Sequence, residues 1–394
     1  MTGGFDLTHV ALVLFLALLG GLFLQRFRQP ALVGYILVGA VIGPGLFGIQ
    51  GNDETIKWLA ELAVVLLMFM VGLELDIARF RESMVVALTV TGCQIALSLG
   101  AMFWLSALFF HWDMPQTVLF GFITSLSSTA VAMTILRQIG RDKADTGRLA
   151  TAILVAQDIA AIPMLLIITT FHGGASGGDL IQLGIALVAV LASLLGVFEL
   201  VQNPRWVARI ERFFTAGARQ PVVAGLTLCF GAAAFSGSLG LSTAYGAFII
   251  GLLIGNVGTQ GESYREAIQP LHDLLMMVFF LSIGLMLDVR FLIDNLIPIA
   301  AVLAAVVVLK TVGNAVILRL MGVGPKSAYP LGAVLGQIGE FSFVLIALGL
   351  SNGFIGNTTY QTALAVIALS LVISPVWLAL VRSFALRRFS EVTN

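Results

Sequence analysis

Apolar stretches follow one another along the chain from His9 to Leu386, separated by short polar interruptions. A helix that crosses a membrane needs about 20 mainly apolar residues, because it rises ~1.5 Å per residue through a hydrocarbon core ~30 Å thick. Thirteen stretches approach that length, so the pattern predicts an all-α membrane protein with thirteen transmembrane helices. In chain order, the predicted spans are 8–27, 31–49, 57–75, 84–110, 116–138, 147–171, 180–201, 221–237, 241–257, 270–287, 291–319, 328–350 and 360–386.

The composition agrees with this pattern. Apolar residues make up 59% of the 394 positions and charged residues only 11%, whereas soluble domains carry about 25% charged residues. The spans leave no room for a soluble domain, so we predict one transmembrane domain over residues 1–394. The formal net charge is zero, and we expect no nucleic-acid partner.

The basic residues predict the orientation. Of the 21 lysines and arginines, 18 lie in or beside the connections after odd-numbered helices or in the C-terminal tail. Basic residues gather on the cytoplasmic side of membrane proteins, so we expect the N-terminus outside and the C-terminus in the cytoplasm. Only Lys310 lies deep inside a predicted span.

Two short motifs recur at one constant spacing. The pattern Gly-Leu-x-Leu-Asp at 72–76 returns at 284–288, and Gly-x-x-Ile-Gly at 39–43 returns at 251–255. Both offsets are 212 residues, since 284 − 72 = 212 and 251 − 39 = 212. This offset moves a residue seven helices onward, which reverses its direction through the membrane. We therefore predict two inverted repeats, helices 1–6 and 8–13, with helix 7 as a linker, a construction typical of secondary transporters.

An acidic residue is predicted at the centre of the bilayer. Asp158 lies ten residues after Arg148 in the sixth span, or about 15 Å along a helix. Ionisable groups at this depth are costly, and they mark ion or proton pathways unless they form a structural salt bridge. Lys310 lies nine residues before Arg319, at a similar depth. We therefore expect Lys310 to pair with Asp158, beside its polar neighbour Gln157.

The fifth and twelfth spans each contain a polar cluster at mid-depth. Hydroxyl side chains compete for helix carbonyls, and paired broken helices in two repeats are a pointer to a transport site. We predict that helices 5 and 12 are interrupted there, although ordinary polar packing is the alternative. The candidate ion-binding side chains of helix 5 are Ser125, Ser127, Ser128 and Thr129, and the residues expected to support the break in helix 12 are Gln337 and Glu340.

Other reactive residues carry weaker signals. Cys93 and Cys229 lie within apolar stretches and are interpreted as small buried apolar side chains. The four histidines form no cluster, and we expect no metal beyond a transported cation. His272 and Asp273 are adjacent and could form a cytoplasmic regulatory contact, but a solvated role is favoured.

The ordered motifs resemble one transporter family. They resemble the Kef-type potassium/proton antiporters of the monovalent cation:proton antiporter-2 family over nearly the whole chain. The motifs that carry the resemblance are Gly-Leu-Glu-Leu-Asp at 72–76, Leu-Ser-Ser-Thr-Ala at 126–130, Gln-Asp-Ile-Ala-Ala-Ile-Pro at 157–163, Leu-Ser-Thr-Ala at 241–244, Phe-Phe-Leu-Ser-Ile-Gly at 279–284 and Gly-Gln-Ile-Gly-Glu-Phe at 336–341.

The resemblance implies a homodimer in a bacterial inner membrane. Helices 4–6 and 11–13 would form a core that moves like an elevator against a dimerisation panel of helices 1–3 and 8–10. The interrupted helices 5 and 12 would cross within this core. Gln157 and Asp158 match the family's glutamine–aspartate pair, and Lys310 matches the lysine that faces it. Asp158 would bind a cation and a proton in turn, and one carboxylate supports the hypothesis of electroneutral 1:1 exchange of K⁺ for H⁺.

Family members often continue into a cytoplasmic nucleotide-binding domain that senses glutathione. We predict no such domain in this chain, since it ends at Asn394 and holds no Gly-x-Gly-x-x-Gly pattern after a strand. No cofactor is expected, and a separate regulatory domain or subunit stays open.

Three alternatives compete with K⁺/H⁺ exchange. The motifs do not separate potassium from sodium, so Na⁺/H⁺ antiport is one alternative. A ligand-gated potassium efflux channel without strict proton coupling is another. An enzyme is disfavoured, because an intramembrane aspartyl protease needs two facing aspartates and the predicted topology puts Asp76 and Asp288 near opposite membrane faces.

Overall fold

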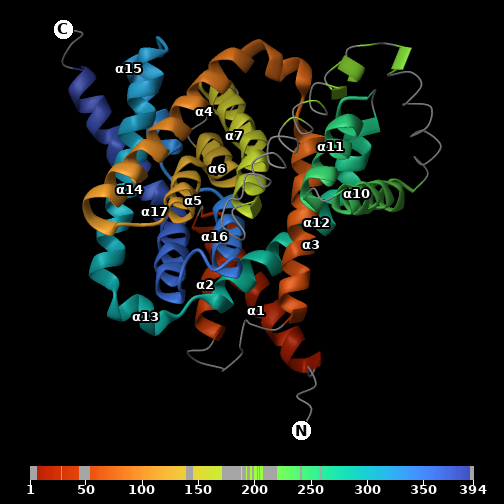
Figure 1. Cartoon of the computed structure of the whole chain (residues 1–394), viewed down its shortest axis with the longest axis horizontal. Helices are drawn as coiled ribbons and strands as arrows, with labels where there is room; N and C mark the ends of the chain where they lie inside the picture. Colours follow the sequence, from red (N-terminus) through yellow and green to blue (C-terminus); the bar gives the residue numbers. More distant parts are fainter. Residues whose placement is uncertain are drawn as a thin grey trace. The chain divides into compact units, whose positions relative to one another are not determined.

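The described part of the chain is built from helices (Figure 1). The computed structural model describes residues 7–27, 29–43, 54–138, 145–170, 220–239, 242–257 and 260–390, with scattered positions between 188 and 206. No strand occurs within these residues. Six of the described helices are at least 18 residues long and apolar enough to cross a membrane, and four shorter ones are also apolar.

The chain divides into two compact units, and the first holds the predicted ion site. It comprises Met1–Gln50, Ser83–Phe171 and Ile283–Asn394. Its helices are α1 (Leu7–Arg26), α2 (Ala31–Ile42), most of α4 (Ile77–Leu105), the π-helical turn η2 (Ser106–Phe110), α5 (Met114–Ser125), α6 (Thr129–Gln138), α7 (Asp145–Thr170), the end of α12 (Gln260–Met286), α13 (Val289–Asp294), α14 (Leu296–Leu320), α15 (Pro325–Val334), α16 (Phe341–Ser351) and α17 (Asn357–Ser390).

The second unit comprises Gly51–Glu82 and His172–Ser282. Its described helices are α3 (Glu54–Glu74), α10 (Pro221–Ser238), α11 (Thr243–Gly255) and most of α12. Glycines let α3 and α11 pack closely, since a Cβ at Gly251 would lie 2.2 Å from the carbonyl oxygen of Phe69. Small residues at such positions are what allow two helix backbones to approach in a membrane protein.

Both helices that were predicted to be interrupted do break in the structure. The first break, Leu126–Ser128, separates α5 from α6, and the second break, Leu335–Glu340, separates α15 from α16. Before the first break, Thr124 Oγ1 donates to the carbonyl of Phe120 at 2.8 Å and Ser125 Oγ donates to that of Phe122 at 2.8 Å. Such bonds back to helix carbonyls compete with the helix ladder.

The two breaks cross in direct contact. The backbone N–H of Gly339 donates to the carbonyl of Leu126 at 3.1 Å. A Cβ at Gly339 would lie 2.9 Å from the carbonyl carbon and oxygen of Ser127, so only glycine leaves room for this approach. The crossing therefore joins the unwound segments of two helices that are far apart in the sequence.

Equivalent contacts occur at the 212-residue offset. In the first unit, a Cβ at Gly284 would lie 2.2 Å from the carbonyl oxygen of Ile36 on α2. In the second unit, a Cβ at Gly72 would lie 2.4 Å from the carbonyl oxygen of Phe248 on α11. These residues correspond in pairs, because 72 + 212 = 284 and 36 + 212 = 248. The local packing agrees with two related halves, while the inverted repeat itself stays a prediction.

The all-helical prediction is confirmed for the described residues, whereas the count of thirteen helices stays a prediction. The linker helix expected over 180–201 and the end of the second span, 44–49, fall mostly or wholly outside the described residues. The interpretation of both cysteines as buried is wrong in part, because Cys229 is buried but Cys93 is exposed on α4. The buried polar residues Thr91, Gln94 and Ser98 share one face of α4, and Cys93 lies on a different face.

Candidate functional site

Asp158 is buried on α7 beside the first break. Its side chain is only 4% exposed, and Thr129 Oγ1 donates a hydrogen bond to its Oδ2 at 3.0 Å. Thr129 is the first residue of α6, so the carboxylate meets a hydroxyl at the N-terminal end of a helix. The positive end of a helix dipole favours a negative charge there. The structure thus brings two of the predicted site residues, Asp158 and Thr129, into contact.

Gln157, the neighbour of Asp158, bonds to the backbone of the first break. Its Oε1 accepts from the N–H of Ser127 at 2.9 Å, which gives a partner to a donor that the helix interruption leaves unpaired. Its Nε2 donates to Oε1 of Gln94 on α4 at 2.7 Å. The amide of Gln157 is therefore held at both ends, and it links α7 to α4 and to the break.

Lys310 reaches the same break from α14. Its Nζ donates to the carbonyl of Leu126 at 2.6 Å, and the side chain is 5% exposed. That carbonyl also accepts from the N–H of Gly339. Lys310 and Asp158 thus contact the same short segment, Leu126–Thr129, at opposite ends. Their mutual ion pair stays a prediction.

The serines of the first break have different partners. Ser127 Oγ donates to the carbonyl of Leu335 in the second break at 2.8 Å. Ser128 Oγ accepts from the N–H of Val131 at 3.3 Å, so it caps the start of α6. Ser125 bonds back to its own helix, as described above. Ser127 therefore ties the breaks together, and Ser128 stabilises a helix end.

The second break contributes Gln337 and Glu340, both buried. Gln337 Nε2 donates to the carbonyl of Ser128 at 3.1 Å, whereas its Oε1 is buried without a hydrogen-bond donor among the described residues. Glu340 is 8% exposed and directly precedes α16. A buried amide oxygen without a donor is costly unless another positive group reaches it. Gln337 therefore presents an oxygen that a cation can use.

Sequence reasoning missed two polar residues of this site, Gln94 and Asn314. Gln94 Nε2 donates to Oδ1 of Asn314 at 3.0 Å, and Asn314 Nδ2 donates to the carbonyl of Leu335 at 3.1 Å. Both amides are at most 4% exposed. Asn314 lies four residues after Lys310, one helical turn on the same face, and this spacing was the signal that could have found it. On α4, the buried polar residues Thr91, Gln94 and Ser98 recur at helical spacing, and this spacing was the corresponding signal for Gln94.

The position of the second half that corresponds to Asp158 holds no carboxylate. That position is Ser370 on α17, since 158 + 212 = 370. Ser370 Oγ accepts from the N–H of Ile338 in the second break at 3.1 Å. Each break is thus contacted by a side chain at the equivalent position, but at that position only the first half supplies a carboxylate. The buried carboxylate of the second break, Glu340, stands at a different position.

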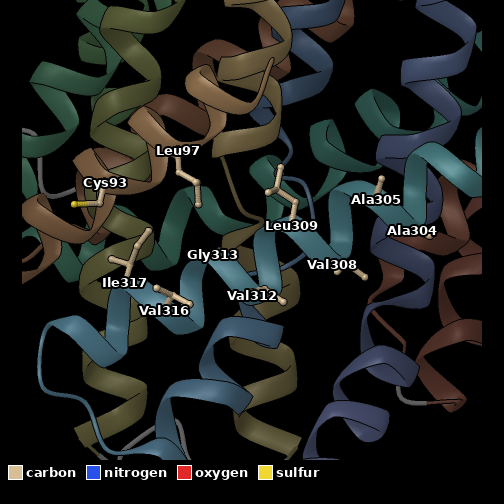
Figure 2. A pocket seen from close by; sticks show the side chains of 10 residues that line it. All are labelled: Cys93, Leu97, Ala304, Ala305, Val308, Leu309, Val312, Gly313, Val316 and Ile317. Atoms are coloured by element: carbon tan, nitrogen blue, oxygen red, sulfur yellow. The ribbon is translucent and has the colours of Figure 1, made fainter. Parts of the chain in front are cut away.

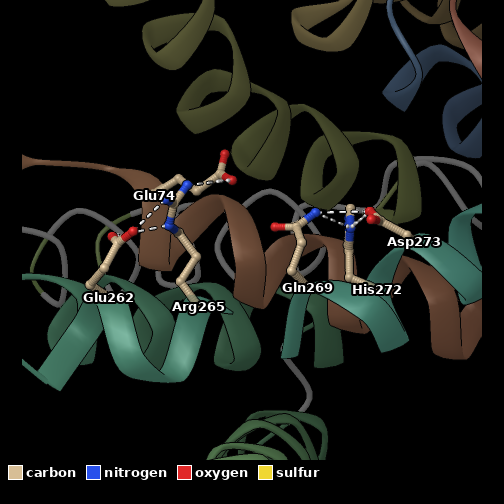
Figure 3. A network of polar contacts seen from close by, with 6 residues as sticks. All are labelled: Glu74, Glu262, Arg265, Gln269, His272 and Asp273. Carbon is tan, nitrogen blue, oxygen red and sulfur yellow. Dashed lines mark hydrogen bonds and ion pairs between the residues drawn. The ribbon is translucent and has the colours of Figure 1, made fainter. Parts of the chain in front are cut away.

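Two other features of the structure do not resemble an ion site. A groove of about 790 Å³ lies between α4 and α14 and is lined by apolar side chains and Cys93 (Figure 2). In the second unit, Arg265 of α12 contacts Glu262 at 2.6 Å and Glu74 at 3.6 Å, and Gln269 and His272 contact Asp273 (Figure 3). These contacts lie on partly exposed side chains. No group of three or more His, Cys, Asp or Glu residues suited to a metal occurs in the described ranges.

The comparison with protein families decides the assignment. Residues 12–382 match the transmembrane region of the sodium/hydrogen exchangers. The chain belongs to the sodium/hydrogen exchanger family. It is therefore a multi-pass integral membrane protein of a cation/proton antiporter family, and its buried carboxylate lies beside two helix breaks.

One sequence relative and two solved structures are similar to this exchanger over nearly the whole chain. The iron transporter MagA from Paramagnetospirillum magneticum is 39% identical over 396 residues, covering 98% of this chain and 87% of MagA. A structure of the sodium proton antiporter MjNhaP1 from Methanocaldococcus jannaschii at pH 8 has a TM-score of 0.67 at 17% identity, covering 95% of this chain and 97% of that one. A second MjNhaP1 structure has a TM-score of 0.64 at 18% identity and covers 99% of both chains.

Proposed function

We propose that this exchanger moves K⁺ against H⁺ and that Asp158 binds the two ions in turn. The observation that carries the proposal is the buried carboxylate of Asp158, held by Thr129 next to two crossing helix breaks. A buried carboxylate is stabilised by hydrogen bonds and by positive charge nearby, and a proton or a cation can each supply that charge. The two ions therefore compete for one site.

The oxygens around the breaks suit a monovalent cation. Unwound carbonyls and uncharged side-chain oxygens supply ligands without adding further negative charge, as in other transporters with broken helices. Gln337 Oε1, which has no donor among the described residues, is the side-chain oxygen that we assign to the cation in addition to Asp158. One carboxylate balances one monovalent charge, which favours exchange of one K⁺ for one H⁺ without net charge movement.

The Kef-type assignment, and potassium with it, rests on the Gln157-Asp158 pair and the motifs around it. In the same proposal, the protein forms a homodimer in a bacterial inner membrane with its C-terminus in the cytoplasm. A core made of the predicted helices 4–6 and 11–13, residues 84–171 and 291–386, carries the site past a panel of the predicted helices 1–3 and 8–10. Sodium is the alternative substrate, since a sodium proton antiporter has the same fold.

Iron is a second candidate substrate, because MagA is an iron transporter and is 39% identical to this chain. Sites for Fe²⁺ in proteins use several imidazole, carboxylate or thiolate ligands. In the part of the chain that the structure describes, no cluster of three such residues is suited to a metal. We therefore place K⁺ and Na⁺ ahead of iron.

Purified protein in liposomes that contain a pH-sensitive dye tests the proposal. An outward K⁺ gradient should acidify the interior as protons enter in exchange, and Na⁺ or Fe²⁺ gradients of equal size should give slower changes. A pH change with Fe²⁺ but not with K⁺ or Na⁺ would show that iron, and not potassium, is the transported cation. No pH change with any of the three cations would rule out cation/proton exchange.

A further inference from the structure

Three buried amides form a continuous hydrogen-bonded chain between the two helix breaks. Gln157 accepts from the N–H of Ser127 in the first break and donates to Gln94, Gln94 donates to Asn314, and Asn314 donates to the carbonyl of Leu335 in the second break. The side chains come from α7, α4 and α14. We call Gln157, Gln94 and Asn314 the amide chain. Ser127 Oγ also donates to the Leu335 carbonyl and closes the ring.

The two ends of the amide chain fix its direction. A backbone N–H can only donate and a backbone carbonyl can only accept. Ser127 N–H therefore requires an oxygen from Gln157, and the Leu335 carbonyl requires an NH₂ from Asn314. Each amide between these ends must accept from the residue before it and donate to the residue after it. The two backbone groups therefore fix which atom of each of the three amides is oxygen and which is nitrogen.

We propose that Gln94 and Asn314 are positioning residues that, through Gln157, hold the two helix breaks in the arrangement that binds the cation. This inference rests on the proposed cation/proton exchange. It gives Gln157 a different role from the one expected from the sequence, because both ends of its amide serve the amide chain. Asp158 is the next residue on α7, so the amide chain that holds Gln157 also determines where the Asp158 carboxylate lies relative to the first break.

Carboxylate substitutions test the direction of the amide chain. An ionised carboxylate only accepts hydrogen bonds, so in Gln94→Glu the side chain at position 94 no longer donates to Asn314. The Asn314 amide must then rotate so that its NH₂ group donates to residue 94. This rotation points the Asn314 oxygen at the Leu335 carbonyl. Asn314→Asp places an oxygen there directly. Both changes put two acceptors together at the second break, although each side chain keeps its size. Both variants should therefore show the same defect.

The measurement is K⁺-dependent exchange in liposomes, with KM and maximal rate obtained separately. A buried acceptor left without a donor is costly and is relieved when the second break moves, which displaces the cation-binding arrangement. We therefore expect the KM for K⁺ to rise about tenfold in Gln94→Glu and Asn314→Asp. The matched control is Gln361→Glu on α17. Gln361 is also a buried amide between a backbone donor, Asp288 N–H, and a backbone acceptor, the Met286 carbonyl, but it belongs to neither break.

Gln361→Glu should change the KM for K⁺ less than twofold. An unchanged KM in Gln94→Glu and Asn314→Asp, or an equal rise in Gln361→Glu, would overturn the positioning role. If Asn314→Asp does not accumulate as folded protein, Asn314→Ser takes its place. A serine hydroxyl can accept and donate at once, so this variant should raise KM less than Gln94→Glu does. A larger rise would contradict the direction of the amide chain.

A double-mutant cycle tests the amide chain without any transport assay. Gln94→Met and Asn314→Leu each cut the same chain, so the unfolding temperature of the double variant should fall by less than the sum of the two single falls. Gln94→Met combined with Gln361→Met should be additive. Additive behaviour in the first pair would refute the amide chain. A wild type that exchanges no cation would refute the proposed function instead.

Discussion

At the scale of single residues, the account depends on Asp158 and the hydroxyl of Thr129 that contacts it. Asp158→Asn removes the only charge that the proposal gives to the cation and the proton, so exchange should fall at least a hundredfold while the protein still folds. Asp145→Asn, on the exposed first turn of the same helix, is the matched control and should exchange at the wild-type rate. If Asp158→Asn exchanged the cation for protons at the wild-type rate, Asp158 would not be the residue that binds the two ions.

Lys310 allows a second residue-scale prediction. Lys310→Met keeps the length of the side chain but removes the charge and the bond to the Leu126 carbonyl. Because that bond ties the first break to α14, the unfolding temperature should fall by about 1–3 °C, as expected for a loss of about 1–2 kcal/mol in a chain of 394 residues. Thermal unfolding in detergent measures this. An unchanged unfolding temperature would contradict the structural role of Lys310.

At the scale of helices, the close crossing of the two breaks is the critical feature. A methyl group at Gly339 would lie 2.9 Å from the Ser127 carbonyl, so Gly339→Ala must push the breaks apart. We expect a loss of about 1–3 kcal/mol in stability and at least a tenfold slower exchange. Gly100→Ala on α4 is the control, since nothing lies within 4 Å of its new methyl group. Gly100→Ala should leave exchange intact, and wild-type exchange by Gly339→Ala would argue against a tight crossing.

The breaks were predictable at this scale, and the contacts between helices were not. Runs of hydroxyl residues near Ser127 and glycines near Gly339 weaken a helix locally, so the sequence alone indicates both interruptions. The depth of Asp158 follows from counting 1.5 Å per residue. The bond from Gln94 to Asn314 depends instead on how α4 and α14 are rotated against each other. Polar residues at helical spacing mark the buried face of each helix, but this spacing does not say which polar side chain of the other helix Gln94 or Asn314 meets.

The start of α12 shows a second limit of the sequence pattern. The predicted span begins at 270, but the helix begins at Gln260. Its first ten residues include Glu262 and Arg265, which bond to each other at i and i + 3 on the helix surface. A hydropathy pattern marks the apolar part of a helix and not its polar extension. Side-chain pairs at this spacing are the signal that would have extended the prediction.

At the scale of the whole molecule, the proposal of one K⁺ for one H⁺ predicts electroneutral transport. Liposomes with a K⁺-independent ionophore that clamps the membrane potential should exchange at the same rate at 0 mV and at about −100 mV. One uncompensated charge moved through that potential would gain about 2.3 kcal/mol, which would change the rate or the final gradient strongly. A clear dependence on potential would show that more than one proton accompanies each cation.

The central claim is that a cation and a proton compete for one carboxylate, and the most direct test is the KM for K⁺ measured as a function of pH. As the pH falls, protons occupy a growing share of Asp158, so the apparent KM should rise and approach a tenfold increase per pH unit. The maximal rate at saturating K⁺ should change little. A KM that stays constant with pH while the maximal rate falls would contradict competition and place proton binding at a separate site.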